Sequence, residues 1–213
     1  MVKKREIRAE ETKKSILLAA GKLFSEQGYD IVSMREIAKE AKCSHTTIYI
    51  YFTNKEALLH QLSMPPLLEL KEEMENTIHE KSLSPEKKLK SVSHEFIRFC
   101  LLNRTMYKVF FNAKASRVDE TNPELDLNKL RIELFNLLSR VLQECLPIQS
   151  SDDRLLGYSR IYFFTIHGIV GTYHNSEESV QTIMKRLGST FDDAIEVLLF
   201  GFKEKIQIGS EGK

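Results

Sequence analysis

The apolar side chains near the start of the chain repeat at helical spacing. They fall at positions i, i+3, i+4, i+7 and i+8 of one segment, namely Ile16, Ala19, Ala20, Leu23 and Phe24. Such a stripe marks the buried face of an amphipathic helix. Gly28 follows where a left-handed residue commonly ends a helix. The pattern therefore predicts a first helix that ends just before Gly28.

Two short helices are predicted directly after it. Ser33 and Glu36 have the spacing of a capping box, in which each side chain accepts a free backbone N–H of the other residue. The residues Lys42-Cys43 then form a short break, and Ser44 is the candidate N-cap of the next helix. Two short helices joined by a tight turn predict a helix-turn-helix, whose second helix would read DNA.

The fourth helix should begin close to residue 55. Ile48 and Phe52 are spaced i, i+4 on the inner face of the third helix, and Thr53 or Asn54 is the candidate cap of the fourth. Pro65-Pro66 should kink or break this fourth helix. We therefore expect a helix-turn-helix domain over residues 1–55 and a second domain over 56–213.

The second domain is predicted to consist of longer helices. Capping residues and apolar stripes place them at 85–102, at 104–114, from Asn122-Pro123-Glu124 to before Pro147, at 152–173 and at 179–205. No segment shows sustained apolar–polar alternation of period two, so the sequence predicts an all-α protein. The last two helices are too apolar to stay exposed, and packed as pairs from two chains they would form a four-helix bundle.

Composition and charge limit the functions that the chain could have. The 213 residues include 31 Lys and Arg against 30 Asp and Glu, so any surface for nucleic acid must be local. Residues 1–60 carry a net charge of +3 and the remainder −2, as expected if only the first part meets DNA. No signal peptide or apolar stretch of membrane-spanning length is evident, so we expect a cytoplasmic protein.

The first sixty residues resemble the TetR family of transcriptional repressors. The resemblance covers about 45 residues and is carried, in order, by Ile16–Tyr29, Ser33–Ala38, Thr47–Phe52 and Lys55–Leu59. It implies an all-helical homodimer that binds a palindromic operator in double-stranded DNA and is released by a small molecule. It also implies phosphate contacts for Ser33, Thr47, Tyr49 and Lys55, and base contacts for Arg35, His45 and Thr46.

Three features qualify these assignments. Lys42 stands where the family's turn usually has Gly, and a left-handed Lys would cost roughly 1 kcal/mol. Cys43 takes the small apolar position after it, and Thr46 replaces a common Gly, Pro or Ala. Tyr51 is as well suited to packing as to DNA contact. Arg35 suits guanine, because a guanidinium matches its O6 and N7 atoms, but the contact is no better supported than its absence.

The second domain offers apolar candidates for a ligand site. Aromatic residues gather on its helices, and one histidine lies within its most apolar helix: Phe96, Phe99, Tyr107, Phe110, Phe111, Tyr162, Phe163 and His167. Such side chains more often belong to a packed core than to a pocket, but a cavity among them would have apolar walls and favour a largely hydrophobic ligand. Gly168 and Gly171 would allow the backbone of a partner's helix to approach closely.

Catalytic chemistry is not indicated by any motif. Neither His79-Glu80 nor His94-Glu95 has the second histidine of a metal-binding HExxH helix, and no phosphate-binding loop occurs, so we expect no metal, cofactor or enzyme activity. The cysteines Cys43, Cys100 and Cys145 are spaced for neither a disulfide framework nor a zinc site, which leaves buried thiols or a redox switch. Two alternatives remain open: a helical-bundle enzyme, and a repressor-like fold that acts through a protein partner or as an architectural DNA-binding factor.

Overall fold

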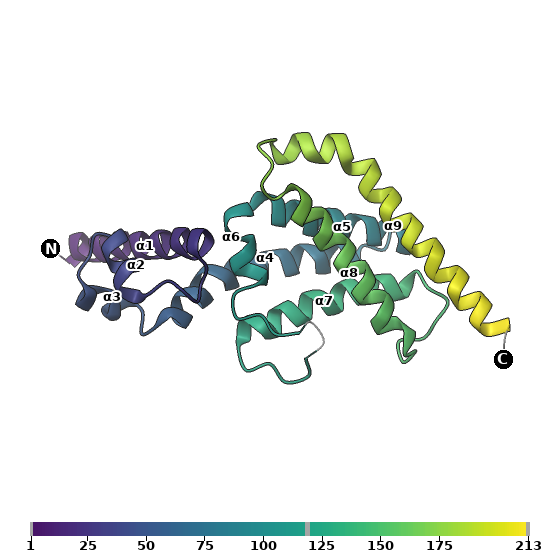
Figure 1. Cartoon of the computed structure of the whole chain (residues 1–213), viewed down its shortest axis with the longest axis horizontal. Helices are drawn as coiled ribbons and strands as arrows, with labels where there is room; N and C mark the ends of the chain where they lie inside the picture. The colour runs from purple at the N-terminus through teal and green to yellow at the C-terminus, as the bar shows by residue number, and fades with distance from the viewer. Residues whose placement is uncertain (1, 118–119, 212–213) are drawn as a thin grey trace. The chain divides into compact units, whose positions relative to one another are not determined.

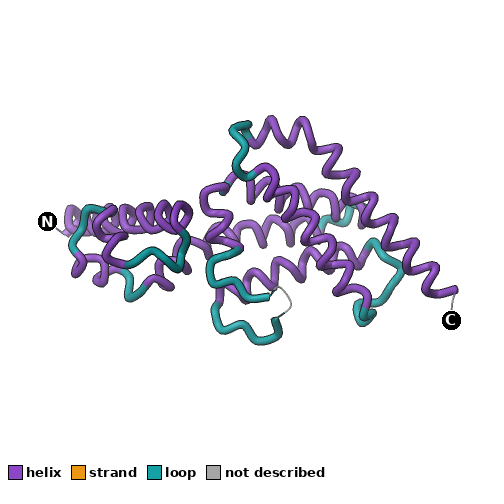
Figure 2. The backbone as a smooth tube through the Cα atoms, in the orientation of Figure 1, coloured by secondary structure: helices purple, strands orange, loops and turns teal. Residues whose placement is uncertain are grey.

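The computed structural model describes residues 2–117 and 120–211, and every regular element in these ranges is a helix (Figures 1 and 2). The predicted all-α class is therefore confirmed. The described residues divide into two compact units. The first unit comprises 2–68 with 105–117 and 120–130, and the second comprises 69–104 with 131–211. Within the described ranges, no helix has the length and apolar character that a membrane span requires.

The first unit begins with four helices that follow the predicted order. They are α1 (Val2–Gln27), α2 (Met34–Glu40), α3 (His45–Tyr51) and the first part of α4 (Lys55–His79). Helix α1 starts fourteen residues before the apolar stripe at Ile16, in a charged segment without a helical signal of its own. Gly28 then ends it with φ +93°, in the left-handed region that glycine adopts without strain.

The predicted caps are confirmed at both short helices. The Ser33 hydroxyl accepts the Glu36 N–H at 3.3 Å while the Glu36 carboxylate accepts the Ser33 N–H at 2.7 Å. Ser44 caps α3 by accepting the Thr47 N–H at 3.0 Å. Of the two candidates for α4, it is Asn54 whose side chain accepts an N–H, that of Ala57 at 2.8 Å.

The core of this unit forms where α1 packs on α2 and α2 on α3. The largest side chains buried there are apolar and come from all four helices: Ile16, Phe24, Ile37, Ile48 and Leu58. Full burial of such a side chain contributes about 1.5–3 kcal/mol. The apolar stripe of α1 is thus its buried face. It packs against α2, and α2 in turn packs against α3.

The second unit contains three long helices that contact one another. These are α5 (Pro85–Leu102), α8 (Arg154–Tyr173) and α9 (Val180–Glu211). Two further helices, α6 (Arg104–Phe111) and α7 (Asp126–Glu144), contribute residues to both units, as does α4. Phe96, Tyr162 and Ile166 are buried at the centre of this unit.

Several predicted boundaries need correction. Helix α4 runs unbroken through Pro65 and Pro66, so the expected break is absent; the buried Leu67 and Leu70 beyond them hold the helix by packing. Helix α7 begins at Asp126 instead of Asn122, because the Leu125 carbonyl is the first acceptor of its ladder. Three other predicted ends shift: α6 stops at Phe111, α8 starts at Arg154, and α9 continues to Glu211 because its apolar stripe reaches Ile206.

Candidate functional site

Helix α3 presents a polar face to solvent and an apolar face to the core. Its side chains at His45, Thr46 and Tyr49 are exposed, whereas Ile48 is fully buried. The His45 and Tyr49 rings meet edge to face with centroids 5.1 Å apart, which fixes both on one side of the helix. Three of the predicted DNA-contacting side chains therefore share one accessible face.

Two other predicted contact residues are held by local hydrogen bonds. Thr47 is half-buried, and its hydroxyl lies 2.7 Å from that of Ser44. The Ser33 hydroxyl donates to the Glu36 carboxylate at 2.7 Å, which lowers the pKa of that carboxyl below its ordinary value. The hydroxyls of Ser33 and Thr47 thus already form hydrogen bonds at the starts of α2 and α3, and a DNA phosphate would have to bind them in addition to these partners. Arg35 is exposed on α2, and Tyr51 is half-buried on α3.

Lys55 occupies a more specific position than the resemblance implies. Its ammonium donates to the backbone carbonyls of Tyr29, Asp30 and Val32, at 2.6, 3.2 and 2.8 Å. It also lies 4.5 Å from the centre of the Tyr29 ring. An ammonium has three N–H donors, and all three are used here. Lys55 thus fastens the loop between α1 and α2 to the first turn of α4.

A second lysine extends this cluster within the first unit. The Lys114 ammonium pairs with the Glu56 carboxylate and lies 5.9 Å from the centre of the Tyr29 ring. The Asn128 amide in turn donates to the Lys114 carbonyl at 2.9 Å. The segment that follows α6 is thereby joined to the start of α4, although 58 positions separate Glu56 from Lys114 in the chain.

One exposed residue of α3 was absent from the sequence prediction. Ile50 is 75% exposed on the helix that carries His45 and Tyr49. Apolar side chains on a reading helix can contact the methyl group of thymine. The signal that could have identified Ile50 is its place between two tyrosines, out of phase with the buried Ile48.

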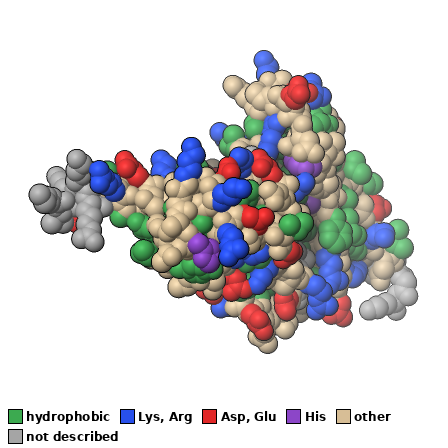
Figure 3. Space-filling model, turned by 60° about the vertical axis from the view of Figure 1, so that its left-hand side comes forward, with side chains coloured by type: hydrophobic (Ala, Val, Ile, Leu, Met, Phe, Trp, Pro, Cys, Tyr) green, Lys and Arg blue, Asp and Glu red, His purple; other side chains and the backbone are tan. Residues whose placement is uncertain are grey.

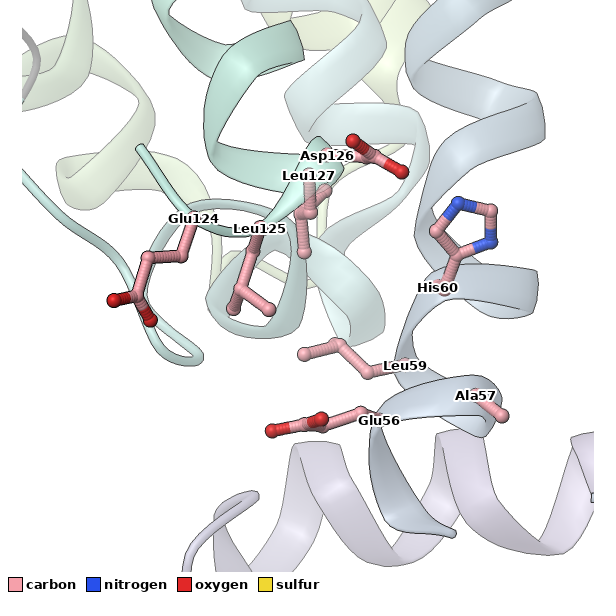
Figure 4. A pocket seen from close by; sticks show the side chains of 8 residues that line it. All are labelled: Glu56, Ala57, Leu59, His60, Glu124, Leu125, Asp126 and Leu127. Atoms are coloured by element: carbon pink, nitrogen blue, oxygen red, sulfur yellow. The ribbon is translucent and has the colours of Figure 1, made fainter. Parts of the chain in front are cut away.

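A small cleft opens in the first unit beside the start of α4 (Figure 4). Its volume is about 260 Å³, and leucines from α4 and α7 line it with acidic residues and His60. The carboxylates of Glu56 and Asp126 already pair with Lys114 and Lys129, and Asp126 points toward His60 in Figure 4. Among the described residues, no group of three or more His, Cys, Asp or Glu side chains could hold a metal ion.

The aromatic candidates of the second unit pack against one another. The ring of His167 lies 5.2 Å from that of Phe96 and 4.1 Å from that of Phe163. Tyr162 is fully buried, and its hydroxyl bonds that of Ser93. Burial lowers the pKa of His167 from 6.5 to about 4, so its imidazole is neutral at physiological pH. These residues form an apolar cluster with a neutral polar group inside it.

Three of the four remaining aromatic candidates belong to the other unit. Tyr107, Phe110 and Phe111 belong to the first unit, where the Tyr107 and Phe111 rings lie 5.5 Å apart. Phe99 is half-buried on α5. The predicted ligand-contacting set is thus distributed over both units, and its role stays a prediction.

The three cysteines are free thiols with protected environments. Cys100 and Cys145 are buried and Cys43 is partly buried. Burial raises the pKa of all three thiols, to about 12 for Cys145. Because the thiolate is the reactive form, these cysteines are poorly suited to a redox switch.

Comparison with known proteins agrees with this geometry. The sequence model of "Bacterial regulatory proteins, tetR family" matches residues 16–62. The Bacillus subtilis regulator YuxN is 53% identical over 49 residues, which make up 23% of this chain and 17% of that protein. The B. subtilis "Fatty acid metabolism regulator protein" is 37% identical over 81 residues, or 38% of this chain and 42% of that protein. The chain therefore matches less than half the length of these relatives.

Solved structures extend the similarity to most of the fold. B. subtilis FadR, solved in complex with stearoyl-CoA, is 25% identical with a TM-score of 0.63, covering 87% of this chain and 97% of that one. The TetR-family regulator PfmR from Thermus thermophilus is 19% identical with a TM-score of 0.64, covering 86% and 93%. The second of these shows likeness of fold alone.

An exposed polar face on a short capped helix, held by two preceding helices, defines a helix-turn-helix protein of the DNA-binding class. Residues 16–62 are similar to the matching segment of TetR-family regulators, in agreement with the resemblance seen in the sequence.

Proposed function

We propose that this protein is a dimeric, sequence-specific repressor of transcription, without enzyme activity, that acts in the cytoplasm. It binds a palindromic operator and is released by a small, largely hydrophobic ligand. In this scheme residues 1–55 contact DNA, and residues 56–213 provide dimerisation and ligand binding. The observation that carries the proposal is the exposed face of α3, which presents His45, Thr46 and Tyr49 on a helix anchored by Ile48.

The distribution of charge on the visible surface supports DNA binding through a small set of residues and not through a broad basic surface. Basic and acidic side chains are interspersed there, without one large area of a single sign (Figure 3). A face with this pattern gives no broad electrostatic attraction to DNA, so binding there would depend on local contacts. We assign base contacts to Arg35, His45, Thr46 and Ile50, and phosphate contacts to Ser33, Thr47 and Tyr49, with Tyr51 beside them. Lys55 is assigned to the positioning of the α1–α2 loop, because its three donors bond backbone carbonyls there.

The DNA test uses the region upstream of the protein's own coding sequence, followed by selection from random duplexes. A near-palindromic site is expected, with half-sites about one helical turn apart or a multiple of it. Arg35→Ala should relax sequence preference, whereas Tyr49→Phe should weaken binding to all sequences alike. Binding without any sequence preference would contradict the repressor and favour the architectural alternative.

Dimerisation is supported by apolar side chains left exposed on α8 and α9. Ile161 and Phe164 on α8 and Phe200 on α9 are 45%, 62% and 67% exposed. Gly168 and Gly171 continue the stripe of Ile161 and Phe164 at helical spacing, and a Cβ atom added at either glycine would meet nothing within 4 Å. This surface is suited to close packing against the same helices of a second copy.

The open space beside Gly168 allows a direct test of the proposed dimer interface. Gly168→Leu has space within the protomer but would hold a partner helix away. We expect a monomer by sedimentation, with lost operator binding and an unchanged helical spectrum. Asn76→Leu adds an exposed leucine on α4 as the control. A fully dimeric Gly168→Leu protein would contradict the packing of glycines between protomers.

The effector class is proposed from a relative and from the apolar cluster. FadR of B. subtilis was solved in complex with stearoyl-CoA. Apolar side chains also gather in the second unit of this chain, as the cluster around His167 shows, so we propose a fatty acyl group as the hydrophobic part of the effector. Stearoyl-CoA should raise the melting temperature and displace operator DNA; if it does neither, this effector class is wrong, and the protein-partner alternative gains support.

A further inference from the structure

A groove of about 850 Å³ runs between α5 and the first turns of α9 in the second unit. Its volume falls within the range of small-molecule sites, about 300–1,000 Å³. Apolar and charged side chains from the two helices line it, among them His94, Glu95, Arg98, Leu102, Met184 and Lys185. The aromatic cluster of Phe96 and Phe163 does not line this groove.

Glu95 gives the groove an unusual feature. Its oxygen Oε1 accepts a hydrogen bond from the Thr77 hydroxyl. Its other oxygen, Oε2, is buried, and no donor among the described residues reaches it. A buried acceptor without a donor is costly, by about 1–3 kcal/mol. Burial also raises the pKa of the Glu95 carboxyl, with a further contribution from the nearby charge of Glu73.

The rim of the groove supplies charge and apolar surface. Arg98 and Lys185 are exposed, and no ion pair within the described ranges engages either one. Leu102 is 61% exposed beside them, and Met184 is half-buried. His94 is engaged differently, since its Nε2 lies 2.9 Å from the Asp192 carboxylate. The groove thus combines two available cations, one acceptor that lacks a donor, and apolar walls.

We propose that this groove binds an amphipathic small molecule that carries an anionic group and an N–H or O–H donor on an apolar chain. The donor bonds Oε2 of Glu95, the anion meets Arg98 and Lys185, and the chain lies against Leu102 and Met184. This assignment rests on the proposed effector class, because acyl-CoA thioesters combine phosphates, amide and hydroxyl donors, and an acyl chain in one molecule.

The experiment compares three probes on the full-length protein by calorimetry at low salt. Stearoyl-CoA has the anion, the donors and the chain; stearate lacks the donors, and coenzyme A lacks the chain. Glu95→Gln is the first variant. Because the Thr77 hydroxyl needs an acceptor, the new amide should direct its NH₂ group into the groove, where it opposes a ligand donor.

We expect Glu95→Gln to weaken stearoyl-CoA binding about tenfold, as for loss of a hydrogen bond to a charged group, and to leave stearate binding unchanged. The double variant Arg98→Gln/Lys185→Gln should weaken stearoyl-CoA binding by a similar factor, less at high salt. Lys205→Gln, at an exposed position of α9 outside the groove, is the matched control and should bind like the wild type.

The other possible outcomes would each contradict either the groove assignment or the effector class. If both groove variants bind stearoyl-CoA as the wild type does, the groove assignment is wrong and the effector class stands. Equal losses for stearate and stearoyl-CoA in Glu95→Gln would show a general disturbance of the fold and also overturn the assignment. If the wild-type protein binds its DNA but none of the three probes, the effector class and the groove assignment both fail.

Discussion

The helix caps of the first unit and the buried polar groups of the second differ in how far apart in sequence their partners lie. In the first unit, the caps at Ser33, Ser44 and Asn54 each bond a residue three positions later. In the second unit, Ser93 bonds Tyr162 and His94 bonds Asp192, across 69 and 98 positions. Local bonds can be inferred from sequence spacing, whereas partners brought together by tertiary packing cannot. The same difference separates the helix-turn-helix, whose proposed role in DNA binding follows from the sequence, from the second unit, whose proposed ligand has to be argued from the structure.

The largest expected effect compares the two cores. Phe96→Ala in the second unit and Phe24→Ala in the first each remove a fully buried ring, at a cost of about 3–5 kcal/mol. Urea unfolding measures both, and Leu18→Ala, at a side chain 65% exposed, should cost well under about 1 kcal/mol. A Phe96→Ala protein as stable as Leu18→Ala would show that the aromatic cluster is loosely packed and free to open for a ligand.

Acid should destabilise the second unit through His167. Its pKa falls from 6.5 to about 4 on folding because the ring is buried against Phe96 and Phe163, so the unfolded chain binds a proton more readily. The stability associated with the neutral ring is therefore present above pH 6.5 and is lost as the pH falls toward 4, by up to about 3 kcal/mol.

Unfolding of the wild type and of His167→Leu at several pH values checks this. The variant should lose less stability than the wild type between pH 6.5 and 4, and exposed His79→Gln controls for loss of a histidine as such. Parallel curves for the wild type and His167→Leu would mean that the ring is accessible to water, as a polar group at the edge of an open pocket would be.

These cases indicate how much of the protein the sequence could predict. The order of the helices, both caps and the buried Ile48 followed from spacing, since each depends on residues within one or two turns. The bonds of Lys55 to the α1–α2 loop did not, because they join positions more than twenty residues apart. The unsatisfied Oε2 atom of Glu95 could not be predicted either, because its lack of a hydrogen-bond donor depends on how α5 packs against other helices.

Lys55→Met tests whether this lysine mainly positions the head or mainly contacts DNA. Loss of three charge-assisted bonds from a half-buried ammonium should cost about 2 kcal/mol of stability. Because its donors are already used, we expect the salt dependence of operator binding to keep its slope. Each phosphate contact contributes about 0.9 to that slope, so a decrease of this size would instead establish the phosphate role that the resemblance implies.

The smallest effect expected is a gain in stability at the turn of the helix-turn-helix. Lys42 has φ +55°, in the left-handed region, where a side chain costs roughly 1–2 kcal/mol and glycine nothing. Glycine also loses more backbone freedom on folding, about 0.5–1 kcal/mol, so Lys42→Gly should stabilise the protein by up to about 1 kcal/mol. Lys114 has φ +47° but pairs with Glu56, so Lys114→Gly should gain less or lose stability. Thermal unfolding of both variants measures the difference. Equal gains would show that the pair with Glu56 adds nothing to stability.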